Sequence, residues 1–313
     1  MRSLRTLVAG AFALPLLAGA QALAPAAPDP RAPMVVSTAW LASHLTDANL
    51  VLLQVGDLKE YEAKHIAGAR FIALQDIATG VPAVKDANQL EMPNPDSLRA
   101  KLAALGVGDQ SRIIVYVGHD RLAATTRVFM TLNWAGLGDR TSLLDGGMDS
   151  WIADGHAVTA AAPPAATTGA LSPLNVKNFV VNAEFVKANI GKNGTSIIDG
   201  RATPFYEGTQ SGNSMGTPHR AGHVASAKSV PFSSVWDETN HLRSPAELDA
   251  IFAKAGVGPK DTVIGYCHIG QQATAMLFAA RATGHPILLY DGSFEDWSRR
   301  TELPVETVPP KRP

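Results

Sequence analysis

The sequence predicts an α/β protein of two tandem domains, each a mainly parallel sheet flanked by helices. Three observations support this prediction: sequence blocks repeat in the same order in both halves, short apolar runs alternate with helical patterns, and a Pro/Ala-rich segment separates the halves. With 313 residues, 46% of them hydrophobic, the chain can bury two cores. A net charge of -1 and the lack of a Lys/Arg-rich run argue against a nucleic-acid partner.

The repeat consists of three pairs of matching segments. The pairs begin at Lys64 and Gly222, at Lys101 and Ile251, and at Ser142 and Leu288. The two members of a pair lie 146 to 158 residues apart, and their order is the same in both halves. A tandem duplication with insertions in loops accounts for this pattern.

The elements of the second copy follow from its hydrophobic pattern. Short apolar runs predict strands at 196–199, 227–230, 262–266 and 286–290. Helical periodicity predicts helices near 182–190, 244–255 and 272–283. The Gly/Ser-rich insertion 207–216 predicts a mobile surface loop, which either covers a site or is a plain surface excursion.

These elements divide the chain into two domains and a linker. We expect the first domain at 34–158, the linker at 159–172 and the second domain at 173–308. The linker is predicted because its Ala/Pro/Thr-rich sequence has no periodicity.

Residues 1–24 predict a secretory signal peptide. Two arginines precede an apolar run from Leu7 to Leu17, and small residues then form two A-x-A cleavage sites. The alternative is an uncleaved anchor helix, but the run is short and contains Pro15. We therefore expect a periplasmic or secreted mature chain without stable insertion in the membrane.

Cys267 is the only cysteine in the chain. In an oxidising compartment a lone thiol forms no internal disulfide, so it is either inert in the core or kept for its reactivity. It follows the predicted strand 262–266 and precedes a predicted helix, at the edge of the sheet where open α/β folds bind ligands. Loop amides and a helix N-terminus favour negative charge there, and Gly270 allows the backbone to approach the sulfur. A reactive cysteine with a lowered thiol pKa is therefore predicted.

Two classes of enzyme use such a loop, and the sequence favours one of them. Sulfurtransferases form a cysteine persulfide, and cysteine phosphatases form a phosphocysteine. The phosphatase loop needs an arginine six residues after the cysteine to hold the phosphoryl oxygens. Ala273 occupies that position, which favours sulfur transfer.

Four segments together resemble the two-domain rhodanese (thiosulfate sulfurtransferase) family. They are the loop Cys267 to Gln272, the element Asp199-Gly200-Arg201, the element beginning Gly222-His223, and the stretch Tyr290 to Trp297. The resemblance implies that Cys267 carries a persulfide and that no cofactor or metal is needed. It also implies a catalytically silent first domain, because Val117 stands opposite Cys267.

The same resemblance implies the residues that bind the small-molecule sulfur donor. They are His268, Ile269, Gly270, Gln271, Gln272 and Arg201. Arg201 either contacts the donor or pairs with a buried carboxylate, and the family comparison favours the second role. His268 either faces the donor or points to solvent.

The loop departs from the better-known members of the family. Thiosulfate-using members carry Arg-Lys after the cysteine and mercaptopyruvate-using members carry small residues, whereas this chain has His268-Ile269. Phe205 stands where those members have an arginine. His268 fills the space of an organic donor and offers a cation for a compact dianion, so we expect thiosulfate as donor, cyanide or another thiophilic acceptor, and a bell-shaped pH profile. The alternatives are a persulfide carrier and a 3-mercaptopyruvate sulfurtransferase.

Other polar residues are interpreted as structural. His219 and His223 are four residues apart, as in some metal pairs, but no third ligand is evident. We interpret His223, like His65 in the first copy, as a packed or hydrogen-bonded residue. The silent copy keeps the equivalents of three further residues, which we interpret as turn and core residues: Asp291, Gly292 and Trp297.

Overall fold

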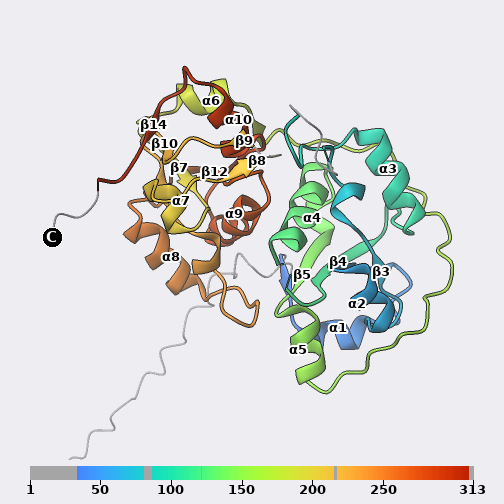
Figure 1. The fold of residues 1–313 in the computed structure, drawn as a ribbon. Coiled ribbons are helices and arrows are strands. Elements are labelled where there is room, and N and C mark those ends of the chain that lie inside the picture. The colour runs from blue at the N-terminus through green and yellow to red at the C-terminus, as the bar shows by residue number, and fades with distance from the viewer. Residues whose placement is uncertain (1–33, 81–86, 121, 215–216, 310–313) are drawn as a thin grey trace, which may run out of the picture.

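The computed structural model describes residues 34–80, 87–120, 122–214 and 217–309 (Figure 1). The predicted signal peptide lies outside the described residues. Within them, no helix is long and apolar enough to cross a membrane.

The first domain is built on a five-stranded sheet. Its strands are β1 (Val35–Val36), β2 (Leu50–Val55), β3 (Arg70–Phe71), β4 (Arg112–Val117) and β5 (Thr141–Leu144). Its α-helices are α1 (Thr38–His44), α2 (Leu58–Ala63), α3 (Pro95–Ala104), α4 (Leu122–Trp134) and α5 (Gly147–Ala153). Short 3-10 helices are η1 (Leu74–Asp76) and η2 (Gly138–Arg140).

The second domain repeats this plan and adds two small antiparallel pairs. Its main strands are β6 (Val180–Val181), β7 (Thr195–Asp199), β11 (Lys228–Ser229), β12 (Thr262–Tyr266) and β13 (Ile287–Tyr290). The small pairs are β8 (Asn213–Ser214) with β9 (Thr217–Pro218), and β10 (His223–Val224) with β14 (Val305–Glu306). The helices are α6 (Ala183–Ala188), α7 (Thr203–Glu207), η3 (Phe232–Ser234), α8 (Pro245–Lys254), α9 (Gln272–Ala282) and α10 (Ser293–Arg299).

The strand orders of the two main sheets confirm the duplication. The first sheet has the strand order β1-β5-β4-β2-β3, and the second has the order β6-β13-β12-β7-β11. Strands at the same place in the two orders correspond to each other. Every pairing in both sheets is parallel. The predicted fold class, two α/β domains with mainly parallel sheets, is therefore correct.

The elements predicted in the second copy are found within one or two residues of their expected bounds, and local signals explain several of them. Ser244 caps α8 and forms a capping box with Glu247, and Pro245 occupies the first turn. Gly265 of β12 lets α9 pack closely, since a Cβ there would lie 2.6 Å from the Leu277 side chain. The insertion 207–216 is only in part a loop, because it contributes β8 to a hairpin with β9.

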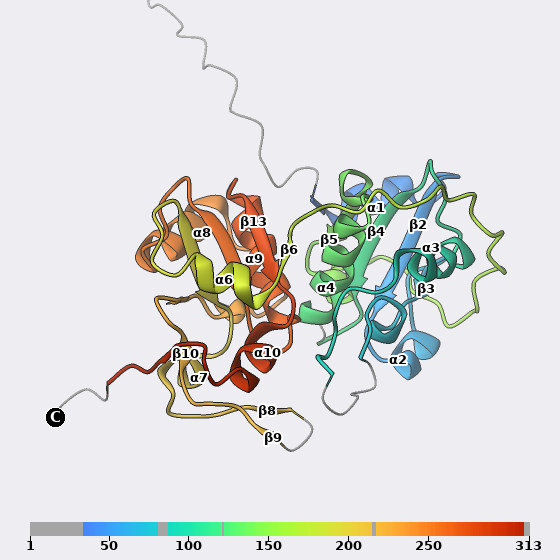
Figure 2. The same cartoon turned by 90° about the horizontal axis from the view of Figure 1, so that it is seen from above.

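One hydrophobic cluster spans both domains, and each domain also has a separate cluster of its own. Seen from above in Figure 2, they lie side by side, with α4 and α9 in contact between the sheets. Phe129 of α4 meets Phe278 of α9 edge to face, with ring centroids 4.8 Å apart. Buried apolar residues from both sheets belong to the same cluster. The first domain is therefore packed directly against the helix that follows Cys267.

Candidate functional site

Cys267 lies at the centre of the second sheet's carboxyl edge. It directly follows β12, which pairs with β7 on one side and β13 on the other, and α9 begins five residues later. Its side chain is fully buried. This is the position predicted from the sequence.

The loop after Cys267 turns its backbone toward the sulfur. Four backbone N–H groups donate to Sγ, from Ile269, Gly270, Gln272 and Ala273. Gly270 makes the turn possible with φ of +78°, and a Cβ there would lie 2.8 Å from the carbonyl oxygen of Asp291. The arrangement stabilises negative charge on a sulfur atom, as an oxyanion hole does on oxygen.

The predicted lowering of the Cys267 pKa is wrong. Burial raises the pKa of the thiol above its ordinary value, and the four N–H groups only partly oppose that effect. The sequence indicated the amides correctly but not the depth of the sulfur.

The start of α10 supports the loop through backbone hydrogen bonds. The Phe294 N–H donates to the carbonyl oxygen of Cys267 at 3.0 Å, and the Glu295 N–H donates to that of His268 at 3.0 Å. The Cys267 N–H donates to Ser293 Oγ at 3.2 Å, and Ser293 Oγ donates to the Tyr290 carbonyl oxygen at 2.9 Å. Asp291 and Gly292, which the sequence suggested as turn or core residues, thus belong to a segment, residues 290–295, that fixes the backbone of the nucleophile.

Arg201 takes the structural role that the sequence analysis favoured. Its Nη2 and Nε donate to the Asp199 carboxylate at 2.6 to 3.1 Å, and Nη2 also donates to the Gly222 carbonyl oxygen at 2.7 Å. Its guanidinium lies 4.0 Å from the Phe294 ring centroid, and the side chain is 1% exposed. Burial acts against the charge, but Asp199 outweighs it, so the pKa of Arg201 is raised. The guanidinium therefore serves the buried carboxylate.

His268 does not carry the positive charge that the sequence suggested. Burial first, and then the nearby charge of Arg201, lower the pKa of His268 to about 4. The ring stands edge to face on Phe205 at 4.6 Å, and Gly212, next to the β8–β9 hairpin, packs against it. At neutral pH His268 is therefore an uncharged side chain packed against Phe205.

The remaining loop residues divide between core and surface. Ile269 packs against the hydrophobic core. Gln271 lines a cleft between the domains, together with Asp120, Asp237, Glu238 and Arg243. Three carboxylates and one arginine thus face this cleft among its described charged residues.

His223 is a packed and hydrogen-bonded side chain. His223 Nδ1 lies 2.7 Å from the Tyr206 carbonyl oxygen, and its ring stacks on Tyr206. His65 makes the same contacts with Tyr61 in the first domain. In the part of the chain that the structure describes, no three metal-ligating side chains come together. The structural interpretation of His223 and His65 is confirmed.

The first domain contains the same frame without the nucleophile. Tyr266 donates to Asp199 at 2.8 Å, and Tyr116 donates to Gln54 at 2.7 Å in the matching position. Val117 follows Tyr116 where Cys267 follows Tyr266. The predicted alignment of Val117 with Cys267 is therefore correct.

Fold and site together define a tandem α/β protein with one cysteine loop built to hold an anionic sulfur. The model of the rhodanese-like domain family matches residues 37–154 and 182–300. The chain belongs to the rhodanese-like domain family.

Known proteins resemble the chain over most of its length. Thiosulfate sulfurtransferase of Rattus norvegicus is 29% identical over 298 residues, which span 87% of this chain and 94% of that protein. A probable 3-mercaptopyruvate sulfurtransferase of Pseudomonas aeruginosa is 28% identical over 278 residues, or 85% of this chain and 95% of that one. The crystal structure of an anaerobic ergothioneine biosynthesis enzyme from Chlorobium limicola with trimethyl histidine shares the fold, with a TM-score of 0.76 at 21% identity, and the match covers 88% of this chain and 70% of that one.

Proposed function

We propose that the protein is a sulfurtransferase that carries sulfane sulfur on Cys267. The single observation that supports this most is the convergence of four backbone N–H groups on the chain's only cysteine. The names of the relatives agree, since one is a thiosulfate and the other a probable 3-mercaptopyruvate sulfurtransferase.

The reaction has two steps. The Cys267 thiolate attacks the outer sulfur of thiosulfate, the S–S bond of the donor breaks, and sulfite leaves with the bonding electrons. Cyanide or another thiophile then attacks the outer sulfur of the persulfide, and the Cys267 thiolate leaves. The loop amides stabilise the negative sulfur in both steps.

Thiosulfate is the donor that the loop favours. His268 and Ile269, the two residues after Cys267, are bulky, which suits a compact donor better than one carrying a carboxylate side arm. Because His268 is neutral at the pH of the reaction, it offers the donor no positive charge, contrary to the expectation from the sequence. The loop amides therefore stabilise the negative sulfur without help from this residue.

A donor panel tests the proposal. We expect thiosulfate to exceed 3-mercaptopyruvate in kcat/KM, and intact-mass measurement to show one added sulfur on Cys267 after thiosulfate treatment. A lead of about tenfold for 3-mercaptopyruvate, the discrimination that a few contacts supply, contradicts the donor assignment. A chain that gains no sulfur from any donor contradicts the sulfurtransferase itself.

The pH profile of the reaction should follow the thiol. Because burial raises the pKa of Cys267, the thiolate is scarce at neutral pH, and kcat/KM for thiosulfate should rise with pH until the thiol has ionised. His268 is already deprotonated throughout this range, so it adds no falling limb. Steady-state rates of wild type and His268→Ala across pH check this. A limb that falls above neutral pH and disappears in His268→Ala restores the cationic histidine.

A persulfide carrier is the second candidate. It is favoured because the buried arginines near the loop are already paired with carboxylates and are not free to bind an anionic donor. Arg127 and Arg201 both pair with buried carboxylates, and the cleft beside Gln271 has three carboxylates. An anionic donor is attracted weakly by such a surface, which suits slow loading and delivery to a partner. Fast single-turnover loading with slow steady-state turnover of small acceptors distinguishes the carrier from the enzyme.

We also propose that the chain is exported, on the strength of its first 24 residues. The mature protein should begin at Leu23 or Pro25, directly after an A-x-A site. N-terminal sequencing of the protein from its native host checks this. A chain that starts at Met1 or Arg2 contradicts it.

A further inference from the structure

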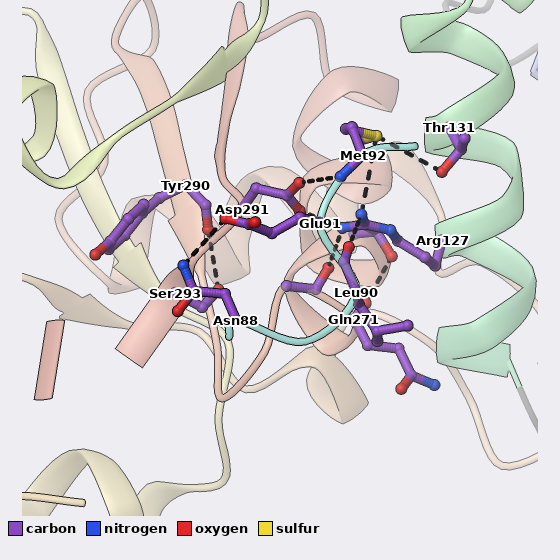
Figure 3. Close-up of polar contacts among 12 residues, drawn as sticks. Asn88, Leu90, Glu91, Met92, Arg127, Thr131, Gln271, Tyr290, Asp291 and Ser293 are labelled. Carbon is purple, nitrogen blue, oxygen red and sulfur yellow. Dashed lines mark hydrogen bonds and ion pairs between the residues drawn. The ribbon is translucent and has the colours of Figure 1, made fainter. Parts of the chain in front are cut away.

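The silent first domain reaches the catalytic loop through one buried arginine. Arg127 lies on α4, and its side chain is 0% exposed (Figure 3). Its Nη1 donates to Asp291 Oδ1 at 2.5 Å and to the Gly270 carbonyl oxygen at 3.2 Å, and both acceptors belong to the second domain. Its Nη2 donates to the Leu90 carbonyl oxygen in its own domain. One guanidinium thus joins the two domains at the loop.

A segment of the first domain, residues 87–92, strengthens this junction. The Met92 N–H donates to Asp291 Oδ2 at 2.8 Å, so both oxygens of that carboxylate accept from the first domain. The Gln89 N–H and side chain donate to Glu295 at 2.8 and 3.1 Å. Glu295 in turn donates its N–H to the His268 carbonyl oxygen. The segment therefore fixes Asp291 and Glu295, which in turn support the loop.

Gly270 is the point at which these contacts affect the nucleophile. Its N–H donates to Cys267 Sγ, and its carbonyl oxygen accepts from Arg127. A Cβ on Gly270 would lie 3.0 Å from Asp291 Oδ1 and 3.1 Å from Arg127 Nη1, so the loop lies directly against the pair. The Gly270 carbonyl lies in the peptide unit that follows the one carrying the Gly270 N–H, so Arg127 acts on that N–H through the backbone turn at Gly270.

We propose that Arg127 of the silent domain is a positioning residue for sulfur transfer, which acts by fixing the Gly270 turn of the loop and with it the N–H groups that face Cys267. This role rests on the proposed function of Cys267 as the sulfur carrier. Arg127 acts through geometry and not through its charge, which Asp291 neutralises. Only a guanidinium has the planar fork that reaches Asp291, Gly270 and Leu90 together.

The test is a titration of the Cys267 thiol, which needs no donor. Cys267 is the only cysteine, so its thiolate absorbance in the ultraviolet is read directly, with the matching Cys267→Ser protein as the blank. In Arg127→Met the midpoint should move to higher pH, and the thiolate fraction below the midpoint should fall about three- to tenfold, the effect of weakening one hydrogen bond to a charged group. The kcat/KM for thiosulfate at the same pH should fall by a similar factor.

Two further variants separate positioning from stability. Arg127→Lys keeps the charge but not the fork, so it should recover thermal stability while its midpoint stays displaced; it also carries the test if Arg127→Met does not fold. Phe129→Leu weakens the same domain interface without touching the loop and should leave the midpoint unchanged. Wild-type midpoints in both Arg127 variants, or an equal displacement in Phe129→Leu, overturn the proposal. A displaced midpoint in a protein that transfers no sulfur instead leaves the positioning intact and rejects the proposed function.

Discussion

Replacing Cys267 by serine is expected to lower kcat/KM for sulfur transfer by more than about 10³-fold, as the loss of a covalent nucleophile does in other enzymes. A hydroxyl at this position cannot form a persulfide, and serine does not ionise in the range where the thiol does. The other members of the site remain, but the N–H groups of the loop then face an atom that accepts no sulfur. Initial rates with thiosulfate and cyanide, together with intact mass after donor treatment, measure the loss.

The same substitution should leave the fold unchanged. Serine differs from cysteine by one atom, and its Oγ can accept from the loop N–H groups that Sγ accepts from. We therefore expect a free energy of unfolding within about 1 kcal/mol of wild type. Residual activity within a few-fold of wild type excludes Cys267 as the nucleophile. If Cys267→Ser loses activity because it does not fold, Cys267→Ala provides the same test without placing a hydroxyl in the buried site.

The positions of the main elements were accessible from the sequence because they depend on local patterns. The run Thr262–Tyr266 is apolar and short, and the turn after it contains a glycine that the backbone needs at positive φ. The duplication added independent support, since each block had to fit the same element twice. Cys267, the alignment of Val117 and the structural role of His223 all follow from such signals.

The properties that the sequence did not yield depend on contacts between distant segments. Arg127 lies on α4 and Asp291 in the turn before α10, 164 positions apart, and no local pattern in either segment indicates how the two domains meet. The pKa of His268 is lowered first by burial and then by the charge of Arg201, which lies 67 positions away along the chain. The pKa of Cys267 is the balance of amides, which the motif indicates, and burial, which it does not.

The buried pair of Arg201 and Asp199 is expected to give the largest change in stability. Arg201→Met removes three hydrogen bonds from the guanidinium to Asp199 and leaves a carboxylate with 0% exposure beside Tyr266 without its counter-charge. Losing one partner of a buried ion pair costs about 3 to 5 kcal/mol, because the other charge remains desolvated. The free energy of unfolding, from urea titration, should fall by that amount.

The double variant Asp199→Asn with Arg201→Met identifies the cause of this loss. With no buried charge left, most of the lost stability should return. Recovery should not be complete, because Tyr266 Oη and the backbone N–H of residue 201 still need an acceptor at position 199. If Arg201 instead served mainly to bind the donor, Arg201→Met would raise KM for thiosulfate and leave the urea midpoint near that of wild type. The structure supports the first outcome, because Asp199 already accepts from both Nη2 and Nε of Arg201.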